Sequence, residues 1–145
     1  MELSPDQKGA VAESAIVHAA IKLGVGVYKP LSDGERCDLI FNIGGNLLRV
    51  QCKWARRLGE TLVVNCRSSR RCLNGYVRRV YTSDEVDAIA AYSLDLDRCY
   101  FLPPHAFDGR LRSSSVLLRR GTTRERELIG PKNSNSKLES WNCFA

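Results

Sequence analysis

The spacing of apolar residues predicts a helix at the start of the chain and a series of short strands after it. In the first segment, apolar residues recur every three or four positions as far as Leu23, as on one face of a helix. Ser4 can cap this helix, Pro5 suits its first turn and Gln7 completes a capping box. Gly24 follows at the point where a helix commonly ends in a left-handed residue. We therefore expect one helix between the cap and this glycine.

Glu13 lies within the apolar face of this expected helix. The other members of that face are Ala12, Ile16, Val17, Ala19, Ala20 and Leu23. A carboxylate in such a stripe either extends to solvent at the edge of the helix or has a function inside the fold. The pattern alone leaves both interpretations open.

Short apolar runs bounded by Gly, Pro and polar residues predict the strands. These runs are residues 25–29, a hairpin at 37–54, residues 61–66 and 99–102, and a weaker run at 115–119. An arginine-rich loop is expected at 67–80. Thr82 to Glu85 match a second capping box, which predicts a helix continuing through Val86, Ile89, Ala90 and Tyr92. The order α-β-β-β-α-β predicts the α/β class, with a mixed central sheet flanked by helices.

The hairpin gathers its polar residues on one face. If Gly44 and Gly45 form the turn, residue 38 opposes residue 51, and if the turn is one residue later, residue 38 opposes residue 53. Alternation then gives one face with Asp38, Ile40, Asn42, Arg49, Gln51 and Lys53. The other face is apolar, with Cys37, Leu39, Phe41, Ile43, Leu48, Val50, Cys52 and Trp54. The polar face is either an ordinary solvated surface opposite the core or a small polar site.

Length and composition indicate one globular domain spanning residues 1–145, with a core at about 4–103 and a basic extension at about 104–145. No apolar run approaches the ~20 residues that a membrane span needs, and the N-terminus does not resemble a secretory signal. We expect no membrane association and a cytoplasmic location.

The net charge of +6 indicates a polyanionic partner, although a basic protein without such a partner has the same composition. Arginine supplies 16 of the 22 cationic side chains, and its planar fork suits phosphates and guanine edges. The six cysteines include no C-x-x-C pair, and neither histidine is close to Cys66 or Cys72 in sequence. A zinc site is therefore not expected, and most of the cysteines are expected to behave as core thiols.

The positions of Glu13 in the helix, Asp38 in one strand and Gln51-Cys52-Lys53 in the next resemble the PD-(D/E)XK nuclease motif. Together with the block Tyr81…Val86-Asp87-Ala88…Tyr100-Phe101-Leu102-Pro103, the chain is similar to the group I intron-associated PD-(D/E)XK homing endonucleases. The resemblance covers roughly two-thirds of the chain and implies a restriction endonuclease-like core. Gln51 replaces the usual acidic residue and Cys37 the usual proline; glutamine is known at this position in the intron-associated branch.

The resemblance implies a role for each of these residues. It implies catalysis by Glu13, Asp38, Gln51 and Lys53, and a Mg²⁺ ion, replaceable by Mn²⁺, held by Asp38, Gln51, Cys52 and Glu13. Lys53 would position the attacking water and stabilise negative charge. The arginines expected to contact DNA are Arg56, Arg67, Arg70, Arg71, Arg78 and Arg79.

The expected function is a Mg²⁺-dependent, site-specific double-strand DNA endonuclease of the homing type. One such site breaks one strand, so a homodimer or homotetramer is expected, with Trp141 and Phe144 as candidate interface residues. Two alternatives remain: a nuclease of the same fold that acts like a Holliday junction resolvase, and a non-catalytic DNA-binding module.

Overall fold

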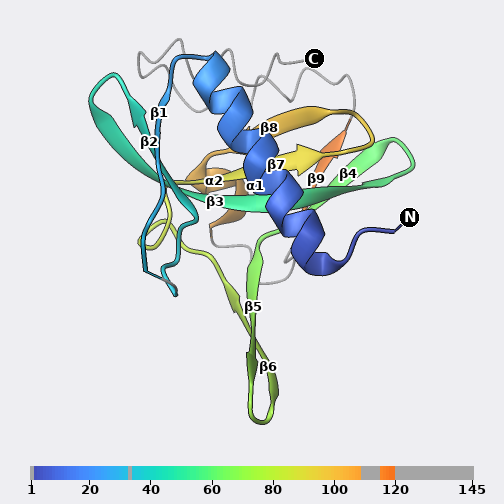
Figure 1. The fold of residues 1–145 in the computed structure, drawn as a ribbon. Coiled ribbons are helices and arrows are strands. Elements are labelled where there is room, and N and C mark those ends of the chain that lie inside the picture. Colours follow the sequence, from blue (N-terminus) through green and yellow to red (C-terminus); the bar gives the residue numbers. More distant parts are fainter. Residues whose placement is uncertain (1, 33, 109–114, 120–145) are drawn as a thin grey trace.

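The computed structural model describes residues 2–32, 34–108 and 115–119, and in these ranges a single long helix crosses a mixed β-sheet (Figure 1). Helix α1 (Pro5–Lys22) begins at the predicted capping box, in which the Ser4 hydroxyl accepts from the Gln7 amide. It ends at Leu23, and Gly24 follows with φ of +71°. Both predicted ends of this helix are confirmed.

The main sheet of the described residues has seven strands, built around the thirteen-residue strand β3 (Asn46–Leu58). Strands β1 (Gly26–Tyr28) and β2 (Leu39–Ile43) lie on one side of β3, with β1 paired to β2. Strand β4 (Thr61–Asn65) pairs with the second half of β3, and β9 (Ser115–Arg119) with β4. Strand β7 (Ala88–Ser93) runs parallel to β3 and pairs with β8 (Arg98–Leu102). The predicted mixed sheet is confirmed.

The two faces of this sheet are covered by two separate apolar clusters. Helix α1 covers the face predicted to be apolar, with a core of Ala12, Ile16, Ala20, Leu39, Phe41, Ile43, Val50 and Cys52 among others. The opposite face also carries buried residues, among them Ala55, Leu62, Val64, Tyr81, Val86, Ile89, Ala91, Leu102 and Phe107. That second cluster includes the short helix α2 (Pro104–Phe107). The polar face of the hairpin is therefore not an ordinary solvated surface.

The prediction of a helix at about 83–92 is wrong, because residues 88–93 form a strand. The capping contact exists, because the Thr82 amide donates to Glu85 Oε2 at 3.3 Å, but only one turn follows it. All six residues of β7 are buried, since β7 lies between β3 and β8 with core on both faces. A strand buried on both faces has no polar alternation, so its sequence resembles that of a buried helix.

The expected loop at 67–80 is a two-stranded hairpin instead. Strands β5 (Arg67–Cys72) and β6 (Gly75–Val80) pair only with each other among the described residues. The hairpin projects well beyond the body of the molecule (Figure 1). Most of its described side chains are exposed, so it lacks the apolar alternation by which strands are recognised in a sequence.

The cysteines are consistent with a reduced core. Cys52, Cys66 and Cys99 are buried as predicted, and none of the five cysteines of the described residues forms a disulfide bond. In the part of the chain that the structure describes, no helix is long and apolar enough to cross a membrane. Trp141, Phe144, Cys143 and the arginines at 110, 112, 120, 124 and 126 lie outside the described residues.

Candidate active site

Asp38 lies immediately before β2 and opposite Gln51 on β3. Of the two turns that the sequence allowed, the structure has the Gly44-Gly45 pair, because Ile43 pairs with Asn46 and Leu39 with Val50. The Asp38 amide donates to the Val50 carbonyl at 3.0 Å, which extends the ladder by one residue. This register brings the two polar side chains together.

The Asp38 carboxylate is held by two donors from β3. Asp38 Oδ2 accepts a hydrogen bond of 2.5 Å from Gln51 Nε2 and one of 2.8 Å from the Cys52 amide. Gln51 is only 8% exposed. Burial nevertheless raises the pKa of Asp38, outweighing the Cys52 amide and the positive charge of Lys53, both of which lower it. Ionisation of this carboxyl group is therefore costly in the folded protein, and a positive charge beside it would lower that cost.

Lys53 lies on the same strand face as Gln51 but points toward the β5–β6 hairpin. Its Nζ donates to the Arg67 carbonyl at 3.1 Å and to the Tyr81 hydroxyl at 3.5 Å. Burial lowers the pKa of Lys53, and the nearby Asp38 charge opposes this shift. Lys53 thus interacts electrostatically with Asp38. Its hydrogen bonds hold it at the foot of the hairpin, which is where β5 begins at Arg67 and where the chain leaves β6 at Tyr81.

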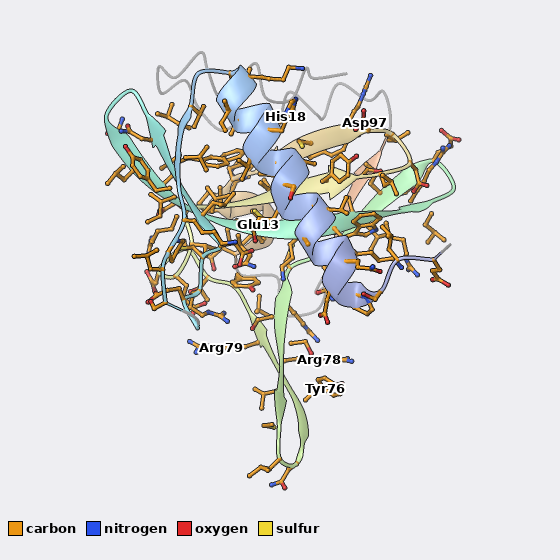
Figure 2. All side chains as sticks on the ribbon, viewed as in Figure 1. Glu13, His18, Tyr76, Arg78, Arg79 and Asp97 are labelled. Atoms are coloured by element: carbon orange, nitrogen blue, oxygen red, sulfur yellow. The ribbon has the colours of Figure 1, made fainter. Side chains whose placement is uncertain are left out.

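Glu13 projects from α1 and forms an ion pair with Lys29, just after β1 (Figure 2). The Glu13 Oε1 to Lys29 Nζ distance is 2.5 Å. The Glu13 charge still reaches the site, because it raises the pKa values of both Asp38 and Cys52. Lys29 has the opposite effect on Asp38 and lowers its pKa. The structure therefore places Glu13 near Asp38, with a lysine partner that the sequence pattern did not indicate.

The donor set fits a hard divalent cation. The Asp38 carboxylate, the Gln51 amide oxygen and the Cys52 carbonyl are all oxygen ligands of the kind that Mg²⁺ prefers. No cluster of three His, Cys, Asp or Glu side chains suited to a metal occurs in the described ranges, so amide and backbone oxygens would have to complete such a site. The Gln51 amide, which donates to Asp38 here, presents its oxygen after a half-turn about its last torsion.

The predicted DNA-contacting arginines lie on two elements. Arg56 is exposed on β3, and Arg67 is partly buried where β5 begins. Arg78 and Arg79 are exposed on β6, on opposite sides of the hairpin, with Tyr76 on the side of Arg78 (Figure 2). In the backbone register, Arg70 pairs with Val77 and Arg71 with Tyr76. Cationic positions thus occur along both strands of the projecting arm.

Sequence reasoning did not anticipate the contacts of three residues at the foot of the hairpin, Arg36, Tyr81 and Glu85. Arg36 donates to Ser68 Oγ at 2.8 Å and to Glu85 Oε2 at 2.9 Å, and its guanidinium lies 4.5 Å from the centre of the Tyr81 ring. Arg36 lies two residues before Asp38, and Tyr81 lies just after the arginine-rich segment. These positions in the sequence are only a weak indication of a role in the site. Their contacts join segments far apart in the sequence, which pattern analysis does not detect.

A further interaction that the sequence did not indicate pairs Arg49 with Asp87. Asp87 Oδ2 accepts from the Arg49 amide at 2.7 Å and from Arg49 Nε at 3.0 Å, while Oδ1 accepts from Nη2 at 2.9 Å. The Arg49 carbonyl accepts from the Asp87 amide at 2.8 Å. This paired set of contacts fixes the start of β7 against β3.

A helix packed on a mixed sheet, with an acid, a glutamine and a lysine on neighbouring strands, is the arrangement expected of a PD-(D/E)XK nuclease. The chain belongs to the PD-(D/E)XK endonuclease family, whose model matches residues 3–136. Its structure is similar to that of a bacterial homing endonuclease, I-Ssp6803I, with a TM-score of 0.71 and 30% sequence identity over 97% of this chain and 93% of that chain. No curated protein sequence matches the chain.

Proposed function

We propose that this nuclease is a Mg²⁺-dependent, site-specific double-strand DNA endonuclease of the homing type. The observation that carries the proposal is the convergence of the Asp38 carboxylate, the Gln51 amide and the Cys52 backbone within one hydrogen-bonded cluster. Lys53 lies one residue further along the same strand, as the family motif requires. Similarity to a homing endonuclease supports the choice of this class within the family.

Asp38, Gln51 and Cys52 would hold the cation, with Glu13 contributing negative charge from α1. When bound, a divalent cation supplies Lewis acidity toward the scissile phosphate and the attacking water. Mn²⁺ has the same preference for oxygen ligands and is expected to substitute. Because Gln51 is neutral, the charge of Glu13 partly replaces the carboxylate that most family members have at position 51.

The residues of the chain perform two further tasks. The Lys53 ammonium, within electrostatic reach of Asp38, orients the water and stabilises negative charge that develops on the phosphate. Burial strengthens this interaction, because fewer solvent dipoles screen it. Asp38 fixes the geometry of the cluster, since its second donor is a backbone amide that cannot change rotamer.

The β5–β6 hairpin supports binding to duplex DNA. The major groove is wide enough for a two-stranded β-ribbon, and the exposed Arg78 and Arg79 lie on opposite sides of this one. Arginines on both sides can contact the phosphates that border the groove, which fixes the arm before any base is read. Arg56, Arg67, Arg70 and Arg71 are proposed to extend this contact.

Double-strand cleavage requires two sites, so we propose that the chain acts as a homodimer or homotetramer. Twofold symmetry would match a target with approximate inverted repeats. A cytoplasmic location, expected from the sequence, stays a prediction.

A cleavage screen tests the proposal. Supercoiled plasmid, linear duplex and four-way junction DNA are incubated with wild-type protein in Mg²⁺, Mn²⁺, Ca²⁺ or EDTA, beside Asp38→Ala and Lys53→Ala. Discrete duplex fragments in Mg²⁺, absent from both variants, are the expected result. Arg98→Gln is a control, since Arg98 is exposed on β8, away from the arm.

The screen also separates the alternatives. Cleavage restricted to junctions would contradict sequence specificity and indicate a resolvase-like nuclease. Salt-sensitive binding without cutting in any metal would leave only a DNA-binding module.

A further inference from the structure

The foot of the β5–β6 hairpin rests on the candidate catalytic lysine. Lys53 Nζ contacts the carbonyl of Arg67, the first residue of β5, and the hydroxyl of Tyr81, the residue after β6. The Tyr81 amide donates to the Cys66 carbonyl at 3.2 Å, which closes the foot. Both strands of the projecting arm therefore end at Lys53.

The ring of Tyr81 is shared by two cations. Lys53 Nζ lies 4.9 Å and the Arg36 guanidinium 4.5 Å from its centroid, and Tyr81 is only 4% exposed. Burial lowers the pKa of Lys53 and Arg36 also lowers it, because the two positive charges repel each other. The electron-rich ring offsets that repulsion. Tyr81 thus forms a buried contact with both cations.

Arg36 connects this ring to both strands of the arm. Its guanidinium donates to Ser68 Oγ in β5 at 2.8 Å and to the Val80 carbonyl in β6 at 3.5 Å. It also pairs with Glu85, whose other oxygen binds Arg79 at 2.7 Å. Arg36 precedes Asp38 by two residues, so one side chain links the Asp38 segment, the arm and the turn before β7.

We propose that Arg36 and Tyr81 are positioning residues that fix the β5–β6 arm relative to Lys53 and so set the distance between the DNA contacted by the arm and the phosphate that is cut. This inference rests on the proposed function, in which the arm contacts DNA. The Arg79–Glu85 pair extends the network onto the exposed arm, where Arg79 is 67% exposed. DNA held by the arm is thereby aligned with the active site through rigid contacts near the foot.

The proposal predicts a specific loss in the variants Tyr81→Leu and Arg36→Gln. Binding to a cognate duplex in Ca²⁺ should change little, because neither residue lies on the exposed part of the arm. The rate constant for cutting should fall about 10- to 100-fold, since small misplacements of a catalytic group are costly. The cuts should also spread over neighbouring phosphates, as mapped by sequencing the product ends. Tyr81→Phe and Arg36→Lys, which keep the ring and the charge, should recover much of the rate.

Tyr28→Leu and Arg98→Gln are the matched controls, being the same substitutions at exposed positions away from the foot, on β1 and β8. They should leave the rate and the cut positions unchanged. Folding of each variant is checked by its thermal transition. Single-position cutting at the wild-type rate by folded Tyr81→Leu would overturn the proposal, as would a loss confined to binding.

An experiment without DNA keeps this inference separate from the proposed function. Lys53 ε-methylene protons near the Tyr81 ring should show an upfield ring-current shift in a ¹³C-resolved NMR spectrum. Arg36→Gln should reduce that shift, because the ring and the arm's foot lose their common anchor, whereas Arg98→Gln should not. An unchanged shift in Arg36→Gln would overturn the positioning role. Failure of wild-type protein to cut any DNA would instead count against the proposed function.

Discussion

The side-chain amide of Gln51 donates a 2.5 Å hydrogen bond to Asp38 Oδ2. In most PD-(D/E)XK nucleases an acidic residue occupies the position of Gln51, and two carboxylates at this separation would repel each other. The glutamine converts that repulsion into a hydrogen bond. A cation held by the Asp38 carboxylate and the Gln51 amide oxygen, as proposed, would therefore have to displace this hydrogen bond.

Gln51→Glu should make the stability of the protein depend more strongly on metal. Repulsion from Asp38 should lower the thermal transition of the metal-free protein, and the added charge should enlarge the rise on adding Mn²⁺. Each tenfold gain in affinity adds about 1.4 kcal/mol of stabilisation at saturating metal. Gln7→Glu, the same substitution in the α1 capping box, is the control. Gln51→Leu should lose both the metal response and cleavage; equal cutting by this variant would show that position 51 has only a structural role.

Asp38→Asn should stabilise the fold while abolishing cleavage. Burial raises the pKa of Asp38, so the folded state favours the neutral form and is penalised when the group ionises. The penalty is absent at acidic pH and develops as the pH rises through the raised pKa. Thermal melts of wild type and Asp38→Asn should therefore converge at low pH and separate toward pH 7, with the variant higher. A variant less stable than wild type at pH 7 contradicts this account.

Asp87→Asn should have the opposite pH signature. The Arg49 hydrogen bonds lower the pKa of Asp87. Ionised Asp87 therefore contributes fully to the free energy of unfolding above its ordinary pKa of 3.8, and this contribution is lost as the pH falls through the lowered pKa. Replacement should cost about 1–3 kcal/mol at neutral pH, because it disturbs hydrogen bonds to a charged acceptor. Urea unfolding at several pH values measures this, with exposed Asp95→Asn as the control. Equal loss at pH 3 and pH 7 would exclude the ionic explanation.

Arg78→Gln should weaken DNA binding without changing cleavage chemistry. If Arg78 contacts a phosphate, binding to every sequence should weaken and the slope of log K against log salt should fall by about 0.9. If it contacts a base, the loss should be about 1–3 kcal/mol and confined to one target position. Filter binding or fluorescence anisotropy over a salt series distinguishes the two results. The same change at Arg98 should alter neither quantity, and an unaffected Arg78→Gln would place the DNA contacts elsewhere.

Mixed assemblies test the proposed oligomer. Wild-type chains combined with an excess of Lys53→Ala chains should convert supercoiled plasmid mainly to the nicked form, because a hybrid has one competent site per target. Sedimentation of the protein with its DNA gives the number of chains. A single chain on DNA that makes clean double-strand breaks would eliminate the dimer and the tetramer.

Local sequence signals predicted the parts of the fold that local forces determine. The α1 ends follow from Ser4, Gln7 and Gly24, whose hydrogen bonds and backbone angles involve only near neighbours. The β2–β3 register follows from the Gly44-Gly45 turn and the alternation of side chains. That register places Asp38 opposite Gln51, which is one of the two pairings that the sequence left open; the shared polar face was predicted in either case.

Long-range packing determined the parts that the sequence did not reveal. Residues 88–93 form a strand because they pair with β3 along one edge and with β8 along the other. Their alanine-rich composition alone would favour a helix. The arm at 67–80 mixes arginines with exposed apolar residues such as Tyr76 and Val77, so its sequence lacks the regular apolar alternation of a half-buried strand. The Tyr81 ring contacts both Arg36 and Lys53, which are far from it in the sequence, and no spacing rule anticipates such contacts.

The β5–β6 arm lies between β4 and β7 in the chain, yet within the described residues its strands pair only with each other. Adding or removing one residue on each strand changes its reach by about 3.3 Å and shifts no register in the main sheet. Its side chains pack little apolar surface, so substitutions near its tip have little effect on folding. With the arm contacting DNA as proposed, a lineage of such proteins can acquire new targets by altering one short segment, while the sheet, the core and the active site are inherited unchanged.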